Sequence, residues 1–471
     1  MTDPKPAQSE PSTRGTLVVA AGPSDARAAC AELAGRSFVL LVLDGERADA
    51  AALRAELAAA GAREVCVAPP PDPAFGAKGG LAARHDLVQR IRAEIARVDA
   101  GLVVAPRPDA RLLALRAASR AACAAADDGN GRRVAFHGLA DGPGELDAPA
   151  AVQWTKAALE RAFPAAPRTT AVVSTWNKRA DLEANVDALR AQTLPFAEIV
   201  VVDNASRDGT AELVKARYPD VRLIEMPHDR FGACETFNKG FQASRTEFTA
   251  ILDDDIVMPP DWLEQATARM QAEPPTTAIV STQVTEPGMP AGYLASERHN
   301  TERYMSTFRG CASLARAKAI AEAGWYDERL FIYGNERDLT CRLLNLGYRV
   351  LQYPGCGVFH KTPFGIKMGK RSLYYHARNA WLSMLKYAPL SDLARMPWLV
   401  LTRVLLRGSK KEAQGEVTDA TGTIGIGRSV RETPGAWWVL ARASFSILAN
   451  VPYCLKHRAP CRAPDFELPL Q

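Results

Sequence analysis

Short apolar runs alternate with segments of helical length over residues 15–150. The runs "TLVVAA", "FVLLVLDG", "EVCVAP" and "GLVVAP" are rich in β-branched residues, and each precedes a stretch of Ala, Leu, Arg and Glu. Strands that alternate with helices form parallel sheets covered by helices. The pattern therefore predicts a small α/β domain. Its first strand ends in "AAGPSD", which lacks the glycine spacing of a dinucleotide site, so a scaffold or docking role is favoured over a cofactor site.

The alternation starts again at residue 168, after a linker predicted at residues 151–167. The runs "TTAVVST", "AEIVVVDN", "VRLIEM" and "FTAILDDD" alternate with helical stretches, and Leu182, Val186 and Leu189 fall on one stripe of the first stretch. This order predicts a second, mostly parallel sheet. Ligands bind beyond the carboxyl ends of the strands in such sheets. Those ends carry "STWN", "VVDNAS" and "LDDD", so three polar clusters should meet at one edge.

The two ends of the chain differ in character from these blocks. Residues 1–14 are polar and contain prolines without an apolar core, which predicts a disordered tail and no signal peptide. Residues 391–471 are predicted to form apolar, basic helices after a main domain at residues 168–390. No eighteen apolar residues follow one another without interruption, so a membrane-spanning helix is not expected.

The helical end of the chain has the composition of a membrane-interfacial segment. Tryptophan favours the headgroup level and cations are drawn to anionic lipid; the alternative is that these helices pack on the main domain as ordinary core. The apolar positions are Trp398, Leu399, Leu401, Val404, Leu405, Trp437, Trp438, Val439, Leu440, Phe445, Ile447 and Leu448. The cations beside them are Arg403, Arg407, Lys410, Lys411, Arg442, Lys456, His457, Arg458 and Arg462.

Composition narrows the functional classes. The 471 residues carry a net charge of only +5, which argues against a dedicated nucleic-acid binder. The nine cysteines form no CxxC pair and their number is odd. They are therefore interpreted as reduced thiols of a cytoplasmic protein, without a zinc ribbon or a disulfide framework.

Three adjacent aspartates, Asp253, Asp254 and Asp255, end the fourth strand of the second block. On a strand the first and third side chains point to the same side. Two carboxylates there make a hard-oxygen site suited to Mg²⁺ or Mn²⁺, which is often shared with substrate phosphates. The alternative is an acidic turn that caps the next helix with its charges in water. The triplet alone leaves both interpretations open.

The order of motifs around this triplet resembles the family 2 glycosyltransferases of the GT-A fold. The segments are "VVSTWNKRADLEANV", "EIVVVDNASRDGTAELV", "ILDDDIVMPPDWLE", "RGCASLARAKAIAEAGWYDERLFIYGNERDLTCRLLNLGYRV" and "VFHK", over roughly residues 168–385. The later "YYHARNAW", with Arg378 and Asn379, resembles bacterial rhamnosyl- and galactofuranosyl-transferase-like members. The resemblance implies a GT-A nucleotide-sugar domain with a mostly parallel sheet.

The resemblance also implies a set of ligand-binding residues. A nucleotide-diphosphate sugar would be held by Thr175, Trp176, Asn177, Asp203, Ser206, Arg230, Asn238, Asp253 and Asp254. Mn²⁺ or Mg²⁺ would be bound by Asp253, Asp255 and His360. Three of these residues have an ordinary alternative: a strand-end turn for Asp203, a surface helix polar group for Asn238 and a packed imidazole for His360. Lys361, Lys367, Lys370 and Arg371 either close over the diphosphate or form a solvated basic loop.

The general base is expected in "YGNERDL". The family commonly has Glu-Asp where this chain has Asn335-Glu336, so Glu336 is the predicted base and Asp338 the second choice. A carboxylate there would remove the acceptor proton as the anomeric carbon is attacked from the face opposite the diphosphate. The alternative for Glu336 is a helix-cap role.

These residues predict a metal-dependent, inverting glycosyltransferase that acts on a hydroxyl of a glycan or a lipid-linked acceptor. It would be cytoplasmic or peripheral at the inner face of the cell membrane, without a nucleic-acid partner. A nucleotidyltransferase is the alternative among enzymes, but it would need a glycine-rich basic loop where "STWNKRAD" stands. An inactive glycan- or nucleotide-binding scaffold is the alternative outside catalysis.

Overall fold

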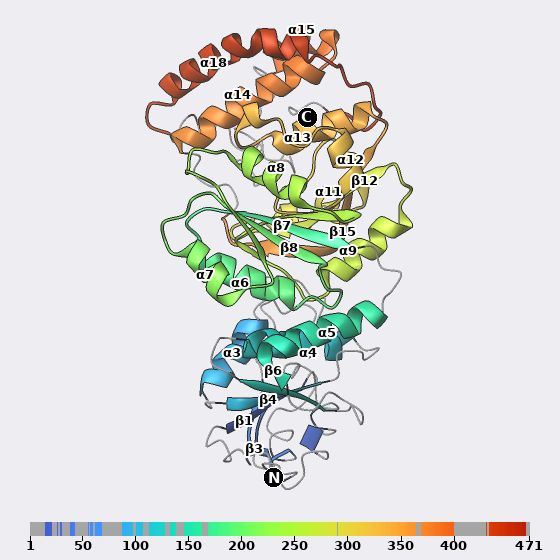
Figure 1. Cartoon of the computed structure of the whole chain (residues 1–471). Coiled ribbons are helices and arrows are strands. Elements are labelled where there is room, and N and C mark those ends of the chain that lie inside the picture. The colour runs from blue at the N-terminus through green and yellow to red at the C-terminus, as the bar shows by residue number, and fades with distance from the viewer. Residues whose placement is uncertain are drawn as a thin grey trace, which may run out of the picture. The chain divides into compact units, whose positions relative to one another are not determined.

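The computed structural model describes residues 168–289, 291–363, 369–399 and 433–467 without a break, and the strands and helices named below within residues 15–162. The chain divides into two compact units (Figure 1). The first comprises residues 1–164, 186–195 and 259–261, and the second comprises residues 165–185, 196–258 and 262–471. The predicted disordered tail at residues 1–14 lies outside the described residues.

The first unit contains an α/β sheet. Among its described residues, six strands lie in the order β3-β2-β1-β4-β5-β6, and all neighbours are parallel except β5 and β6. The four apolar runs predicted as strands are β1 to β4. The strands are β1 Gly15–Ala20, β2 Phe38–Val42, β3 Ala62–Val67, β4 Ala100–Pro106, β5 Arg133–His137 and β6 Leu146–Asp147. The helices include α3 Leu87–Arg97, α4 Leu113–Ala126 and α5 Ala148–Ala162.

The second unit is built on a larger mixed sheet. Nine strands of the described residues follow the order β11-β15-β12-β14-β10-β7-β8-β9, with β13 on β15. The strands are β7 Thr169–Thr175, β8 Glu198–Asp203, β9 Arg222–Glu225, β10 Phe248–Asp253, β11 Ile256–Val257, β12 Thr277–Thr285, β13 Arg303–Tyr304, β14 Ala312–Arg316 and β15 Arg349–His360.

The four strands predicted in this block, β7 to β10, are all present and mutually parallel. The strand β14 was not predicted, and it runs antiparallel to both β10 and β12. Its five residues "ASLAR" are too short to show an alternating pattern of their own. They form a strand because β10 and β12 both offer unpaired backbone groups.

Helices cover the sheet where the sequence predicts them. Leu182, Val186 and Leu189 of α6 are fully buried, which confirms the predicted apolar stripe. On α8, a Cβ at Gly240 would lie 2.3 Å from Val172 Cγ1, so glycine lets this helix lie close to β7. The helices are α6 Arg179–Arg190, α7 Thr210–Arg217, α8 Ala233–Ala243, α9 Trp262–Ala272, α10 Ala291–Leu294, α11 Glu297–Asn300, α12 Ala317–Glu322, the 3-10 helix η3 Glu328–Leu330, and α13 Asn335–Asn345.

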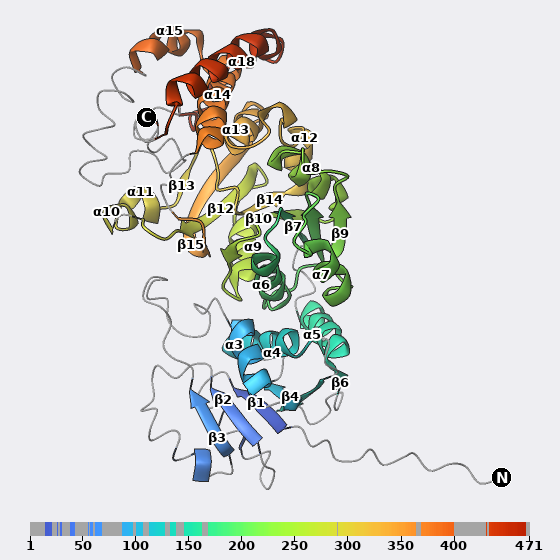
Figure 2. The same ribbon diagram turned by 90° about the vertical axis from the view of Figure 1, so that its left-hand side faces the viewer.

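Three further helices, α14 Lys370–Tyr387, α15 Leu390–Leu399 and α18 Ala436–Lys456, follow the sheet. Helix α18 lies alongside α14 in both views (Figure 2), where Leu373 packs against Ala436 and Val439. By length and composition alone α18 is apolar enough to cross a membrane, and 17% of its most apolar stretch is buried. The predicted positions Leu401, Arg403, Val404, Leu405, Arg407, Lys410 and Lys411 lie outside the described residues.

Candidate active site

An acidic cluster forms where the ends of two strands of the second unit meet. Strand β10 ends at Asp253, and after a turn β11 pairs with the end of β15, so that Ile256 lies opposite His360. This pairing brings together the three residues predicted to bind metal: one ligand atom each from Asp253, Asp255 and His360 lies within 4.8 Å of the others. The Nε2 atom of His360 is 3.1 Å from Asp255 Oδ1 and 3.8 Å from Asp253 Oδ2.

Three residues that the sequence did not predict complete this cluster. Glu286, directly after β12, places Oε1 2.9 Å from His360 Nδ1 and so orients the imidazole. Lys178 Nζ donates to Asp255 Oδ2 at 2.6 Å, and the Thr362 hydroxyl donates to the same oxygen at 2.8 Å. Glu286 carries the same strand-end signal as Asp203 and Asp253, whereas nothing in the sequence points from Lys178 to the aspartates.

The charges in the cluster are strongly coupled. Burial alone would raise the pKa of Asp255, but hydrogen bonds and positive charge from His360 and Lys178 hold it well below its ordinary value. Burial alone would lower the pKa of His360, but its bonds to Asp255 and Glu286 raise it to about 10. Burial raises the pKa of the neighbouring Asp254 to about 7.

This donor set fits a divalent cation. Carboxylate oxygens and an imidazole nitrogen are ligands that Mn²⁺ accepts, and Mg²⁺ accepts the oxygens. An imidazole must lose its proton before it binds metal, so a bound cation would take the place of that proton. His360 Nδ1 donates its hydrogen to Glu286 Oε1, which leaves Nε2 directed at the two aspartates.

A cavity of about 320 Å³ joins the acidic cluster to the predicted base. Asp253, Glu286 and His360 line one part of it, and Glu336 lines another. Glu336 lies in the first turn of α13, where its Oε1 accepts a hydrogen bond from Asn335 Nδ2 at 3.0 Å. Burial raises the pKa of Glu336 to about 7. A buried carboxyl that titrates near neutrality has the property required of a general base.

Gly310 makes room for this carboxyl. A Cβ at position 310 would lie 2.4 Å from Glu336 Oε1, which is well inside van der Waals contact. The residue therefore has to be glycine for Glu336 to keep its present rotamer.

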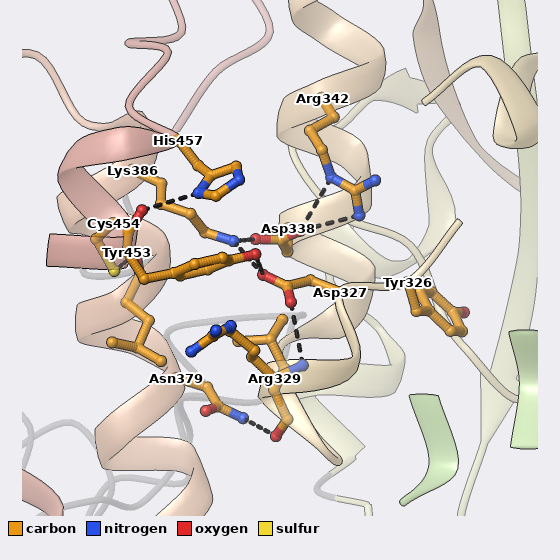
Figure 3. A network of polar contacts seen from close by, with 12 residues as sticks. Tyr326, Asp327, Arg329, Asp338, Arg342, Asn379, Lys386, Tyr453, Cys454 and His457 are labelled. Atoms are coloured by element: carbon orange, nitrogen blue, oxygen red, sulfur yellow. Dashed lines mark hydrogen bonds and ion pairs between the residues drawn. The ribbon is translucent and has the colours of Figure 1, made fainter. Parts of the chain in front are cut away.

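Asp338, the second predicted base, lies in a different environment (Figure 3). Its side chain is fully buried, and it contacts Lys386 Nζ, Arg342 Nη2 at 2.9 Å and Tyr387 Oη at 3.2 Å. Lys386 also forms an ion pair with Asp327 at 2.8 Å. Asp338 is not one of the described residues that line the cavity. The structure therefore brings Glu336 to the cavity and places Asp338 in an ion-pair network.

Five of the residues predicted for the nucleotide, Thr175, Trp176, Asn177, Asp203 and Ser206, lie at or just after the ends of β7 and β8, where Thr175 and Asp203 lie side by side. The two following loops are joined by hydrogen bonds: Asn177 N donates to Ser206 Oγ at 2.8 Å, and Arg207 N donates to Asn177 Oδ1 at 2.7 Å. Trp176, between them, is 46% exposed. The sequence-predicted cluster at this edge is thus present.

Asp203 carries an unused acceptor at this edge. Its Oδ2 accepts from Ser206 N at 3.2 Å, while its buried Oδ1 has no hydrogen-bond partner among the described residues. The carbonyl Oδ1 of Asn204 is in the same condition. Buried acceptors without donors are unfavourable, so a ligand with N–H or O–H groups would be stabilised here.

The other residues predicted to bind ligands are placed elsewhere. Asn238 is buried, where it donates to Tyr326 O and Glu328 Oε1 and accepts from Tyr326 N at 2.9 Å. Its amide is therefore used within the protein and is not a surface polar group. Arg230 is exposed in a turn after β9.

The basic residues after β15 are dispersed. Lys361 forms an ion pair with Asp181 at 2.7 Å, and Arg371 lies 5.5 Å from the ring centre of Phe331. Lys370 begins α14, and Lys367 lies outside the described residues.

Parts of this chain are similar to known proteins. Residues 170–321 match the family model of glycosyl transferase family 2, and this segment belongs to that family. The putative glycosyltransferase EpsH of Bacillus subtilis is 29% identical over 100 residues, which cover 21% of this chain and 29% of EpsH. The succinoglycan biosynthesis protein ExoO of Rhizobium meliloti is 36% identical over 107 residues, 22% of this chain and 30% of ExoO. These matches span less than a third of each relative.

Among solved structures, a mannosyltransferase from Pyrobaculum calidifontis in complex with GDP-Man and Mn²⁺ is 19% identical, with a TM-score of 0.38 over 61% of this chain and 75% of that one. The family assignment, together with the α/β sheet of the second unit, confirms the predicted GT-A fold class.

Proposed function

We propose that this protein is a metal-dependent, inverting glycosyltransferase that moves a sugar from a nucleotide-diphosphate sugar to a hydroxyl group. The observation that supports this most strongly is the cavity itself. It is lined both by the acidic cluster, which could hold a metal ion, and by the buried carboxyl of Glu336, whose pKa is raised to about 7. The family assignment of residues 170–321 supports the same class of reaction.

In this proposal the donor lies along the strand ends of the second unit. The unpaired Oδ1 of Asp203 accepts an N–H of the nucleobase, and the indole of Trp176 is available for contact with the base or ribose. Asp253, Asp255 and His360 would hold a divalent metal, which would offset the negative charge that develops on the departing diphosphate. Lys178, beside the same aspartates, adds a fixed positive charge.

Glu336 acts on the acceptor in this proposal. Its carboxylate takes the proton of the acceptor hydroxyl, whose oxygen attacks the anomeric carbon from the face opposite the diphosphate, which inverts the configuration. The acceptor is proposed to be a glycan or a lipid-linked precursor, at the cytoplasmic face of the cell membrane. The exposed apolar side chains of α18, among them Trp437, Trp438 and Phe445, support peripheral contact with lipid.

The test is a panel of UDP-, GDP- and dTDP-sugars with Mn²⁺, scored for nucleotide release and for sugar transfer. We expect one donor to release nucleoside diphosphate, and excess EDTA to abolish the release. The variant Asp255→Asn should also weaken Mn²⁺ binding in calorimetry, which is independent of turnover. Full activity in EDTA would contradict metal dependence. Release of pyrophosphate from a nucleoside triphosphate and a sugar phosphate would instead identify a nucleotidyltransferase, and no reaction with any donor would favour a scaffold.

A further inference from the structure

The loop that leads into the proposed base has an unfavourable backbone. Phe331 and Tyr333 have φ angles of 68° and 64° although neither is glycine, and Gly334 follows with a φ of 75°. Residues with a Cβ rarely adopt this region, and such conformations persist only where the surroundings hold them. Contacts from other parts of the protein must therefore hold the backbone of residues 329–334 in this conformation.

Two side chains of α14 hold this loop by its carbonyl groups. Asn379 is 1% exposed, and its Nδ2 donates to the carbonyls of Leu330, Ile332 and Tyr333 at 2.9, 2.9 and 2.8 Å. Two hydrogens serve three acceptors, so one is shared. Arg378 Nη1 donates to Arg329 O at 2.9 Å and to Asn379 Oδ1 at 2.7 Å, which fixes the direction of the amide.

Helix α8 holds the loop from another direction. The backbone N–H of Cys234 donates to Phe331 O at 3.1 Å, so each of the five carbonyls from residue 329 to 333 receives a hydrogen bond. A Cβ at Gly232 would lie 2.3 Å from the same Phe331 oxygen. Glycine at position 232 is therefore what allows the loop to come this close to α8.

The held loop forms part of the cavity. Ile332, Tyr333 and Gly334 line it together with Glu336, two residues further on. The ring of Tyr333 stacks on His376 of α14 with centres 4.3 Å apart, and His376 also lines the cavity. A shift of this loop would move the start of α13, and with it the carboxyl of Glu336.

Helix α18 supports the same arrangement. Arg378 Nε donates to Ser446 Oγ at 2.9 Å, and the guanidinium of Arg329 lies 4.2 Å from the ring centre of Tyr453. Figure 3 shows Arg329 between Tyr453 and Asn379. Arg378 is therefore oriented from α18 while it orients Asn379.

We propose that Asn379, oriented by Arg378, is a positioning residue that sets Glu336 against the acceptor hydroxyl. This inference rests on the proposed function, because it assumes that Glu336 is the base. It assigns a role to Arg378 and Asn379 of "YYHARNAW". Neither residue has a hydrogen bond or ion pair with the acidic cluster or with the residues at the ends of β7 and β8.

The test compares Asn379→Ala with Asn345→Ala in the full-length protein. Asn345, exposed on α13, also donates its amide to a backbone carbonyl, that of Ala459 at 2.7 Å, and does not line the cavity. For Asn379→Ala we expect kcat for transfer to fall about 10–100-fold while the KM and affinity for the donor stay within about twofold. Hydrolysis of the donor by water should fall less than transfer, because it does not need the acceptor hydroxyl placed on Glu336. Asn345→Ala should match the wild type.

If Asn379→Ala does not fold, Ser446→Ala replaces it, since it removes only the partner of Arg378 Nε and should give a smaller loss of the same kind. Unchanged kcat in the variant, or loss of kcat together with an equal loss of donor affinity, would overturn the inference. A wild-type protein that transfers no sugar would overturn the proposed function instead, so the two failures are distinguishable.

Discussion

At the scale of single residues, the pKa of Glu336 leads to a test by pH. Burial raises that pKa to about 7, and only the ionised carboxylate can accept a proton. We therefore expect kcat/KM to rise with pH through about 7 and to level off above it. Glu336→Gln should lower turnover by about 10²–10⁴-fold, the usual contribution of a general base, and leave donor affinity unchanged. Near-normal turnover of the Gln variant would contradict the assignment.

Gly310→Ala offers an indirect way to disturb the same carboxyl. The added Cβ would lie 2.4 Å from Glu336 Oε1, and because that atom ends a flexible side chain, the side chain should move and the fold remain. We expect a loss of kcat that is not additive with Glu336→Gln, since both changes act on one group.

Gly292→Ala is the matched control for Gly310→Ala, because a Cβ there would meet no atom within 4 Å apart from its chain neighbours and its own helix backbone. The measurement is kcat for Gly310→Ala, Glu336→Gln, the double variant of these two and Gly292→Ala. Additive losses would show that Gly310 acts through something other than Glu336.

The sequence predicts the positions of candidate residues best where they lie at strand ends. Asp203, Asp253 and His360 end or follow strands, and the order of motifs points to them. Lys178 is different, because its contact with Asp255 spans 77 residues and depends on the pairing of β7 with β10. Asn379 is hidden for a similar reason: its three partners are backbone carbonyls, which leave no trace in a pattern of side chains.

At the scale of elements, a buried ion-pair network joins η3 and α13 to α14. Lys386 contacts both Asp338 and Asp327, and its side chain is 3% exposed (Figure 3). Replacing it with methionine leaves the buried Asp338 and the partly buried Asp327 short of a counter-charge. Removing one partner of a buried pair commonly costs about 3–5 kcal/mol, so Lys386→Met should lower the free energy of unfolding by that order in a urea titration.

Asp338→Asn separates a structural role from a catalytic one at the same network. It keeps the shape of the side chain and removes the charge that Lys386 and Arg342 face. We expect reduced stability with kcat per folded molecule close to that of the wild type. A kcat loss as large as that of Glu336→Gln, at unchanged stability, would return the base role to Asp338.

Elements are predictable from the sequence where local pattern and final partners agree. The strands β7 to β10 carry apolar runs, which are rich in β-branched residues in β7 and β8, and each pairs with another of these strands. The strand β14 has no such run, and only the gap between β10 and β12 makes it a strand. The pairing of β11 with the end of β15 is likewise non-local, although it is what brings Asp255 to His360.

At the scale of the whole molecule, α18 of the second unit presents an apolar face to solvent. Trp437, Trp438, Phe445 and Leu448 are 78%, 70%, 73% and 66% exposed. Positions 437, 441, 445, 448, 452 and 455 recur at helical spacing, so they form one stripe. The buried residues Ala436, Val439 and Ala443 lie on the other side. Isolated exposed apolar residues are ordinary, but a continuous apolar stripe indicates a surface that binds a membrane or an apolar partner.

This stripe has the features of a helix that lies in the membrane interface. Tryptophans at one end favour the headgroup level, while Arg442 and Lys456 are exposed on the same helix. Cations near an anionic surface contribute about 1 kcal/mol each. We therefore expect the full-length protein to co-sediment with vesicles that contain phosphatidylglycerol at low salt, and to be released as salt rises.

The decisive comparison is the triple variant Trp437→Ser, Phe445→Ser and Leu448→Ser against Leu346→Ser, which removes an apolar side chain that is 54% exposed on a different helix end. Burial of each large apolar side chain contributes about 1.5–3 kcal/mol, so the triple variant should bind vesicles at least about tenfold more weakly. Its thermal stability should change little, since these side chains are exposed, and Leu346→Ser should bind as the wild type does. Equal pelleting of the triple variant and the wild type, or none by either, would mean that the stripe does not meet lipid and that α18 serves only to brace α14.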